Sequence, residues 1–237
     1  MKTLKSSLEP LESRITPGTV TVSFVNGVLS FAGSSTADGF SVSGDHGSGN
    51  ITVEAYPGTQ FTYGKGDITG TATSFELDKP VQAIKAKLGD GNDTVAFHGK
   101  INARLDLDLA GKSSGADNDA VMVGGWEWYG TKAVGGMKIK TGGGDDSVLI
   151  IGANIVGGTK VDLGSGLDSF VSHFSRFAGS LSIKASDGNG GSGLGADGVD
   201  IFGSRIVGGF AFTGGHEGAD IRFGEGSKVG RDIKVSV

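Results

Sequence analysis

The chain has no cysteine among its 237 residues, so no disulfide contributes to its stability and cysteine usage does not report the redox compartment. Only 4 residues are proline, which excludes a collagen-like chain and a Pro-rich linker. No apolar run approaches the roughly 18 residues of a membrane-spanning helix. The net charge of −5 also lacks the basic excess of a nucleic-acid groove. We therefore expect no transmembrane segment and no nucleic-acid partner.

Glycine, by contrast, supplies 45 residues, well over twice its usual share of roughly 7%. Hydrophobic residues make up 37% of the chain, which is enough for a long thin core but low in leucine and aromatic mass for one compact globule. We expect a single elongated domain whose corners are rich in glycine.

The glycines belong to a repeated corner that ends in aspartate. Residues 88–93 (LGDGND), 141–146 (TGGGDD) and 163–168 (LGSGLD) share one spacing. Segments that alternate apolar or Thr residues with polar ones form the strands of the repeat, because a period of two indicates a β-strand. Five such segments align: Ile84–Leu88, Leu105–Leu109, Met137–Thr141, Thr159–Leu163 and Leu181–Ala185. Such short repeats must stack on their own copies to bury an apolar face.

A second series of small and aliphatic residues has the same period. Its members Val134, Val156, Ala178, Val207 and Val229 are 22, 22, 29 and 22 residues apart, so one coil carries an insertion, around residues 187–191. The sequence therefore predicts an all-β fold, a right-handed parallel β-solenoid with about 22 residues per coil. The hand follows from the general preference of parallel crossovers.

One outward column of charged residues tests the register of this alignment. In successive strands it contains Lys87, Asp108, Lys140, Asp162 and Lys184, which alternate in sign. Opposite charges across a strand pair contribute roughly 0.2–1 kcal/mol each, whereas like charges destabilise. The alternation therefore favours this register over a slipped one.

Residues 1–18 lack the strand pattern and are expected to form a flexible leader. Within them, residues 8–17 (LEPLESRITP) resemble the LEPR-type N-terminal motif of bacterial surface and exported proteins, although Ser13 stands where that motif usually has Asp. The resemblance implies export and an extracellular or cell-surface location.

The rest of the chain divides into a cap and a solenoid. Residues 19–80 have less regular strands and are expected to form N-terminal capping coils, because an open first coil would expose its core and its unpaired backbone. Residues 81–237 are expected to form the solenoid. The apolar plug of the cap is expected from Phe61, Tyr63, Phe75 and Leu77.

The aspartates of the corners are the candidate metal ligands. Carboxylates stacked at roughly 5 Å repel each other, so either backbone N–H groups of the glycine turns or a hard cation such as Ca²⁺ must compensate. The Gly-x-Gly-x-Asp pattern resembles the calcium-binding repeats of the RTX β-roll family, which implies calcium as cofactor. That family repeats every nine residues, whereas this chain has one corner per coil. The candidate ligands are Asp90, Asp93, Asp119, Asp145, Asp146, Asp168, Asp200 and Asp220.

Two further features are candidates for ligand binding. Trp126 and Trp128 would share one face of an extended segment, and could stack on sugar rings or cover an apolar edge. Arg176 and Arg205 occupy equivalent places in their coils, and either receive an acidic glycan or form salt bridges to the aspartate corners.

Signs of catalysis are few. The four histidines, His46, His98, His173 and His216, show no metal or triad spacing, and no Gly-x-Ser-x-Gly nucleophile turn is present. We expect a non-catalytic exported or cell-surface structural and interaction module, with a surface glycan or a protein as partner. The alternatives are a glycan-active β-helix enzyme, a polysaccharide lyase or hydrolase, and a carbohydrate-binding adhesin.

Overall fold

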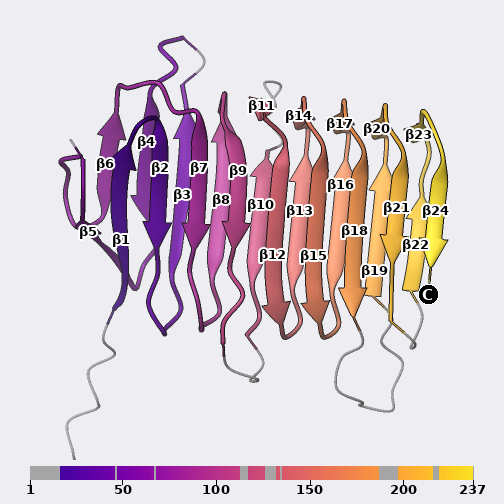
Figure 1. The fold of residues 1–237 in the computed structure, drawn as a ribbon, viewed down its shortest axis with the longest axis horizontal. Coiled ribbons are helices and arrows are strands. Elements are labelled where there is room, and N and C mark those ends of the chain that lie inside the picture. Colours follow the sequence, from indigo (N-terminus) through magenta and orange to yellow (C-terminus); the bar gives the residue numbers. More distant parts are fainter. Residues whose placement is uncertain are drawn as a thin grey trace, which may run out of the picture.

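The computed structural model describes residues 17–45, 47–66, 68–112, 117–125, 132–133, 135–186, 197–215 and 219–236. These residues form β-strands and turns, and no helix occurs among them. None of the described segments is therefore a helix that could cross a membrane. The strands follow one another along a rod, from the N-terminal region at the left of Figure 1 to the C-terminal region at the right.

The strands belong to three sheets. Sheet A has the order β24 (Ile233–Ser236), β21 (Phe210–Thr213), β18 (Leu181–Ser186), β15 (Thr159–Ser165), β12 (Met137–Gly143), β9 (Arg104–Asp108), β7 (Ala83–Lys87), β2 (Val28–Ala32), β1 (Gly18–Val25), β5 (Thr59–Tyr63). Sheet B has the order β22 (Ala219–Phe223), β19 (Asp197–Phe202), β16 (Ser169–His173), β13 (Ser147–Ile151), β10 (Ala120–Gly124), β8 (Thr94–Gly99), β3 (Gly39–Gly44), β4 (Ile51–Ala55), β6 (Ser74–Leu77). Sheet C contains β11 (Lys132–Ala133), β14 (Asn154–Ile155), β17 (Arg176–Phe177), β20 (Arg205–Ile206) and β23 (Lys228–Val229).

From β7 onward every strand pair in the three sheets is parallel, as the stacking of coils predicts. From β9 onward each coil contributes a strand to each sheet, for example β12, β13 and β14. Ile139 pairs with Val161, and Val161 pairs with Ile183, so residues 22 positions apart lie side by side. The architecture is consistent with a parallel β-solenoid.

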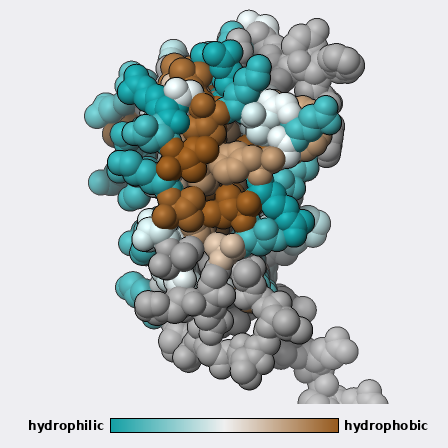
Figure 2. All heavy atoms as spheres, turned by 90° about the vertical axis from the view of Figure 1, so that its right-hand side faces the viewer, coloured by the Kyte–Doolittle hydropathy of each residue, from teal (hydrophilic) through white to brown (hydrophobic). Residues whose placement is uncertain are grey.

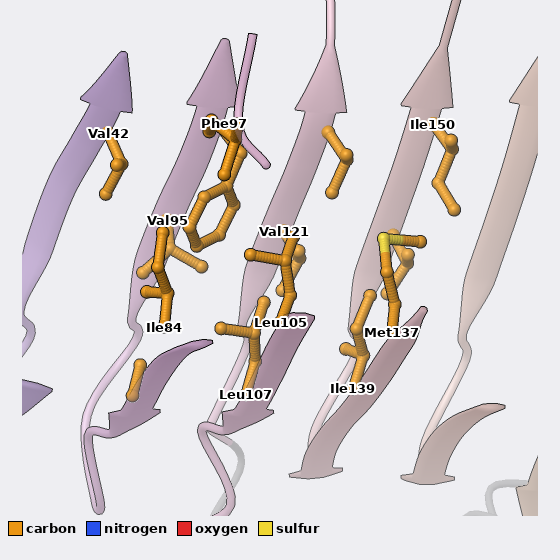
Figure 3. Packing of buried hydrophobic residues seen from close by; sticks show 14 of the residues in the cluster. Val42, Ile84, Val95, Phe97, Leu105, Leu107, Val121, Met137, Ile139 and Ile150 are labelled. Carbon is orange, nitrogen blue, oxygen red and sulfur yellow. The ribbon is translucent and has the colours of Figure 1, made fainter. Parts of the chain in front are cut away.

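The core lies between sheets A and B, where the inward residues of both sheets meet (Figure 3). Along β12 the inward Met137 and Ile139 are buried and the outward Lys138 and Lys140 are exposed. Before the last coil, each inward side chain is buried by the coils on both sides of its own as well as by the facing sheet. The cohesion of the rod therefore comes from the hydrophobic effect acting between coils.

The charged column of sheet A has the predicted register. Asp108 pairs with Lys87 on one side and with Lys140 on the other, and Asp162 lies between Lys140 and Lys184. The Lys184 ammonium is 3.7 Å from the Asp162 carboxylate. The sign alternation is thus confirmed as a set of neighbours along the rod.

The predicted alignment of sheet C was wrong by one residue in its last coil. Val229 pairs with Ile206 and not with the residue after it. The inward residues of this sheet are Ile155, Phe177 and Ile206, whereas Val156 of the predicted series is exposed. Val229 is the apolar residue available in the last coil, so it takes the inward position.

The N-terminal region closes one end of the core with antiparallel strands. β1 pairs with β2, and β4 pairs with both β3 and β6 in this way. The predicted plug residues Phe61, Phe75 and Leu77 are buried there. The Phe61 and Phe75 rings meet edge to face at 5.6 Å, and Tyr63 contacts Phe75 in the same manner at 5.8 Å.

The opposite end of the described rod is not covered in this way. β22, β23 and β24 form the last coil, and the side chains of Ile233 and Val235 are 54% and 53% exposed. Figure 2 looks onto this end and shows an apolar area with polar residues around it. The two ends of the rod therefore differ in their surface chemistry.

Candidate functional site: the aspartate corner

The predicted corners join sheet A to sheet B, and glycine backbone conformations make the turn. Gly142 and Gly144 have φ of 126° and 120°, and Gly164 has φ of 87°. These values are readily adopted only by residues without a Cβ. A Cβ on Gly164 would also collide with the Gly142 carbonyl oxygen of the preceding coil. Close stacking of the coils at this corner therefore requires glycine.

A file of five buried aspartates runs along the inside of this corner: Asp38, Asp93, Asp119, Asp146 and Asp168. Each of the last four accepts, through Oδ1, the backbone N–H of the aspartate one coil before it. The N to Oδ1 distances are 2.8, 2.8, 2.8 and 3.0 Å in that order. We call these residues the inner file.

A second file lies next to it and runs in the opposite direction. The Asn118 N–H donates to Asn92 Oδ1 of the preceding coil, the Asp145 N–H donates to Asn118 Oδ1, and the Leu167 N–H donates to Asp145 Oδ1. Turn residues cannot continue the sheet ladder, yet their N–H groups need acceptors. The two files supply these acceptors and fix each coil against both of its neighbours.

The second carboxylate oxygens of the inner file have a different environment. Oδ2 of Asp93 and Oδ2 of Asp119 are buried and have no hydrogen-bond partner among the described residues. Leaving a buried polar atom unsatisfied costs about 1–3 kcal/mol, and more when it is charged. Either a proton or a cation is therefore needed to make this arrangement favourable.

The electrostatics of the inner file favour the protonated form in the absence of a cation. Burial, together with the charges of the neighbouring Asp93 and Asp146, raises the pKa of the Asp119 carboxyl to about 9, although the N–H that it accepts acts in the opposite direction. Burial likewise raises the pKa of Asp93 to about 8 and that of Asp146 to about 6. At neutral pH Asp93 and Asp119 therefore keep protons that they would lose in the unfolded chain, whereas Asp146 is mostly ionised.

Two more carboxylates lie beside the inner file, at Gly111. Asp117 Oδ1 accepts the Gly91 N–H at 2.6 Å, and Asp90 Oδ1 accepts the Lys112 N–H at 2.5 Å. A Cβ on Gly111 would collide with carboxylate oxygens of both residues. Their negative charges contribute to the raised pKa of Asp93. Carboxylates of two successive corners, Asp90 and Asp117, therefore lie close together at Gly111.

The structure brings together six of the eight predicted ligands and separates two. Asp93, Asp119, Asp146 and Asp168 form the inner file, and Asp90 and Asp145 lie in the turns beside it. Asp200 and Asp220 instead lie within β19 and β22. Asp220 is ion-paired with Arg222.

The alignment of the repeats within the sequence misplaced one aspartate of the corners and missed two. Because Ser169 pairs with Gly198, the residue next to Asp168 in the following coil is Asp197 and not Asp200. Asp38 and Asp117 were not identified. Asp38 carries the signal that the inner file shares, an aspartate two residues before a buried apolar residue, here Phe40. Asp197 also stands two residues before an apolar residue, Val199, but the insertion before β19 concealed its equivalence to Asp168.

The other candidates do not assemble a catalytic centre in the part of the chain that the structure describes. His98 Nδ1 lies 2.9 Å from the Gly124 carbonyl oxygen, and His173 lies 3.7 Å from Asp200. His46, His216 and the Trp126–Tyr129 segment lie outside the described residues. Among the described residues Arg176 and Arg205 form no salt bridge to the aspartate corners, which was one of the two alternatives for them, because sheet C begins at the far end of the sheet B strands.

Comparison with protein-family models, with curated proteins and with solved structures found no match to this chain.

Proposed function

We propose that the protein is a non-catalytic structural and interaction module of the cell exterior, a right-handed solenoid of about 22 residues per coil whose aspartate corners bind calcium. The observation that carries the proposal is the pair of buried oxygens Asp93 Oδ2 and Asp119 Oδ2 in the inner file, which have no hydrogen-bond donor among the described residues. Export is supported by the motif at residues 8–17. A role as a rod is supported by the two files, which bind each coil to the next from Asp38 to Asp168.

The chemistry of the donors fits a hard cation. The inner file offers carboxylate oxygens, and the glycine turns offer backbone carbonyls, which are the ligand types that Ca²⁺ prefers. Within the described residues no three acidic or histidine side chains converge on one point that could hold a metal ion. Calcium would therefore be held by carboxylates of neighbouring coils, with Asp93 and Asp119 the strongest candidates, and by carbonyl oxygens. When bound, it would supply positive charge between stacked carboxylates.

The proposal is tested by unfolding the protein in the calorimeter with calcium and with a chelator. A ligand that binds only the folded chain stabilises it by about 2.7 kcal/mol at 100 times its dissociation constant. We expect calcium to raise the melting temperature at about pH 8.5, and to do so far less at about pH 5, where protons occupy the same carboxyls. An identical melting temperature with calcium and with chelator at the higher pH would refute calcium binding.

A matched variant locates the effect. Asp119→Asn keeps a side-chain oxygen that can accept the Asp93 N–H but removes the charge. We expect this variant to fold and to lose most of the calcium response. Asp78→Asn, at an exposed position outside the corner, should respond to calcium as the unsubstituted protein does.

A further inference from the structure

The corner between sheets B and C, on the other side of the sheet B strands, carries a strained and exposed aromatic residue. Phe174 follows β16, and its side chain is 57% exposed. Its φ is 51°, in the left-handed region. The residues at its register position in the two neighbouring coils are Gly152 and Gly203, with φ of 61° and 58°. The turn requires a left-handed backbone at this position. The two adjacent coils meet this requirement with glycine, whereas this coil has a phenylalanine.

This placement is unfavourable for folding in two ways. A residue with a Cβ is strained at positive φ, and such strain is concentrated at functional sites. A large apolar side chain in water also forgoes the gain from burial. A glycine at 174 would avoid both costs, so the phenylalanine points to a role outside folding.

The ring of Phe174 has a defined position. It extends over the next coil, where a Cβ on Gly203 would lie 2.6 Å from its Cδ1 atom. It meets the Phe202 ring edge to face, with centroids 5.4 Å apart and planes at 90°. The His173 ring is 5.8 Å from that of Phe202. The three rings form an aromatic platform on the surface of the corner.

A column of cations begins two residues after the platform. Arg176 pairs with Arg205, and Arg205 pairs with Lys228, so three positive side chains are neighbours on successive strands about 4.8 Å apart. All three are exposed. Among the described residues no carboxylate lies within 4.0 Å of these cations, although Arg176 donates to Asn154 Oδ1 at 3.3 Å. Like charges stacked in this way repel each other, and an anionic ligand would relieve the repulsion.

The backbone beneath the platform and the column is held by buried serines. Ser204 Oγ donates to the Ser172 carbonyl at 3.0 Å and accepts the Ser175 N–H at 3.1 Å. Ser175 Oγ in turn accepts the Ala153 N–H of the preceding coil. These bonds fix the corner before any ligand arrives, which lowers the entropic cost of binding.

We propose that this strip binds an acidic polysaccharide, with a sugar ring against Phe174 and carboxylates paired to Arg176 and Arg205. Guanidinium groups bind carboxylates through paired hydrogen bonds, and an aromatic face accepts the apolar face of a sugar ring. Asp200, whose carboxylate lies 3.7 Å from His173 Nε2, is an acceptor for sugar hydroxyls. A polysaccharide presents such hydroxyls on every ring, whereas the sugars of a DNA backbone have none to donate. The strip therefore favours a glycan over DNA.

The test uses the full-length protein and polygalacturonate as the probe, with pullulan as the neutral polysaccharide and single-stranded DNA as the other polyanion. Affinity electrophoresis at low salt should show retardation by polygalacturonate alone. Phe174→Gly should weaken binding about tenfold, an effect at the lower end of that seen when a nucleic-acid base loses its aromatic stacking partner. The melting temperature of this variant should stay the same or rise. The double variant Arg176→Gln, Arg205→Gln should weaken binding at least tenfold. Its affinity for polygalacturonate should not depend more steeply on salt than that of the unsubstituted protein.

The control is Lys160→Gln, which removes an exposed cation from β15 on sheet A and should bind polygalacturonate as the unsubstituted protein does. The proposal is overturned by an absence of polygalacturonate binding, by full affinity in either strip variant, or by equal retardation in pullulan or by DNA. Because none of these measurements involves calcium, failure here is distinct from failure of the calcium proposal.

Discussion

Replacing Asp119 by Asn offers a direct measurement of the inner file in the absence of calcium. The asparagine side chain can still accept the Asp93 N–H, which Asp119 Oδ1 accepts at 2.8 Å. It resembles a carboxyl that is permanently protonated. The substitution therefore leaves the hydrogen bond between coils in place and removes only the titration.

The sign of the effect follows from the raised pKa. The Asp119 carboxyl has a pKa of about 9 in the folded protein against 3.8 for an unperturbed group, so between these values the folded chain holds a proton that the unfolded chain has released. Its contribution to stability is complete below about pH 3.8 and is lost as the pH rises toward 9. Each pH unit in this window removes up to about 1.4 kcal/mol.

From about pH 5 to about pH 8 the loss from this one group amounts to at most about 4 kcal/mol. Coupling to Asp93 and Asp146 distributes part of the loss over the file, so at least about 1 kcal/mol is expected from the substitution. The free energy of unfolding of Asp119→Asn should exceed that of the unsubstituted protein by an amount that grows over this range. Urea titrations with chelator at several pH values would measure it. Parallel pH profiles for the two proteins would refute the assignment of a buried protonated carboxyl.

Three other substitutions test the packing of the rod. Gly164→Ala should lower the free energy of unfolding by more than about 3 kcal/mol in urea titrations, because the new methyl group meets a carbonyl at positive φ; an effect below about 1 kcal/mol would contradict the close approach of the coils. Lys140→Asp places three aspartates in one column and should cost about 1–2 kcal/mol at low salt. Raising the salt in the same titration should reduce this loss, and an effect independent of salt would speak against the column. Phe75→Ala should cost about 3–5 kcal/mol in thermal unfolding, whereas a small loss would show that the aromatic plug is dispensable.

Much of the fold could be predicted because, in a stacked repeat, residues that are neighbours in space recur at a fixed spacing in the sequence. The alternation in Met137–Thr141 and Thr159–Leu163 identified sheet A, and the signs of Lys140 and Asp162 identified its register. Both patterns can be recognised without any knowledge of the tertiary structure, because each residue packs against the equivalent residue of the next coil.

The errors arose where that equivalence is interrupted. Asp38 belongs to the cap, whose antiparallel strands do not follow the period, so its place in the inner file was not recognised. The insertion before β19 displaced the alignment from Asp197 to Asp200. The strain at Phe174 was invisible in the sequence, because only the backbone shows that its neighbours at that position are glycines with positive φ.

The two ends of the described rod differ in what can stack on them. The aromatic plug around Phe61 and Phe75 closes one end, and the side chains of Ile233 and Val235 are exposed at the other. An apolar surface made of parallel strands can receive a further coil in the same register, whereas the antiparallel strands of the plug cannot. Addition of coils is therefore possible in one direction only.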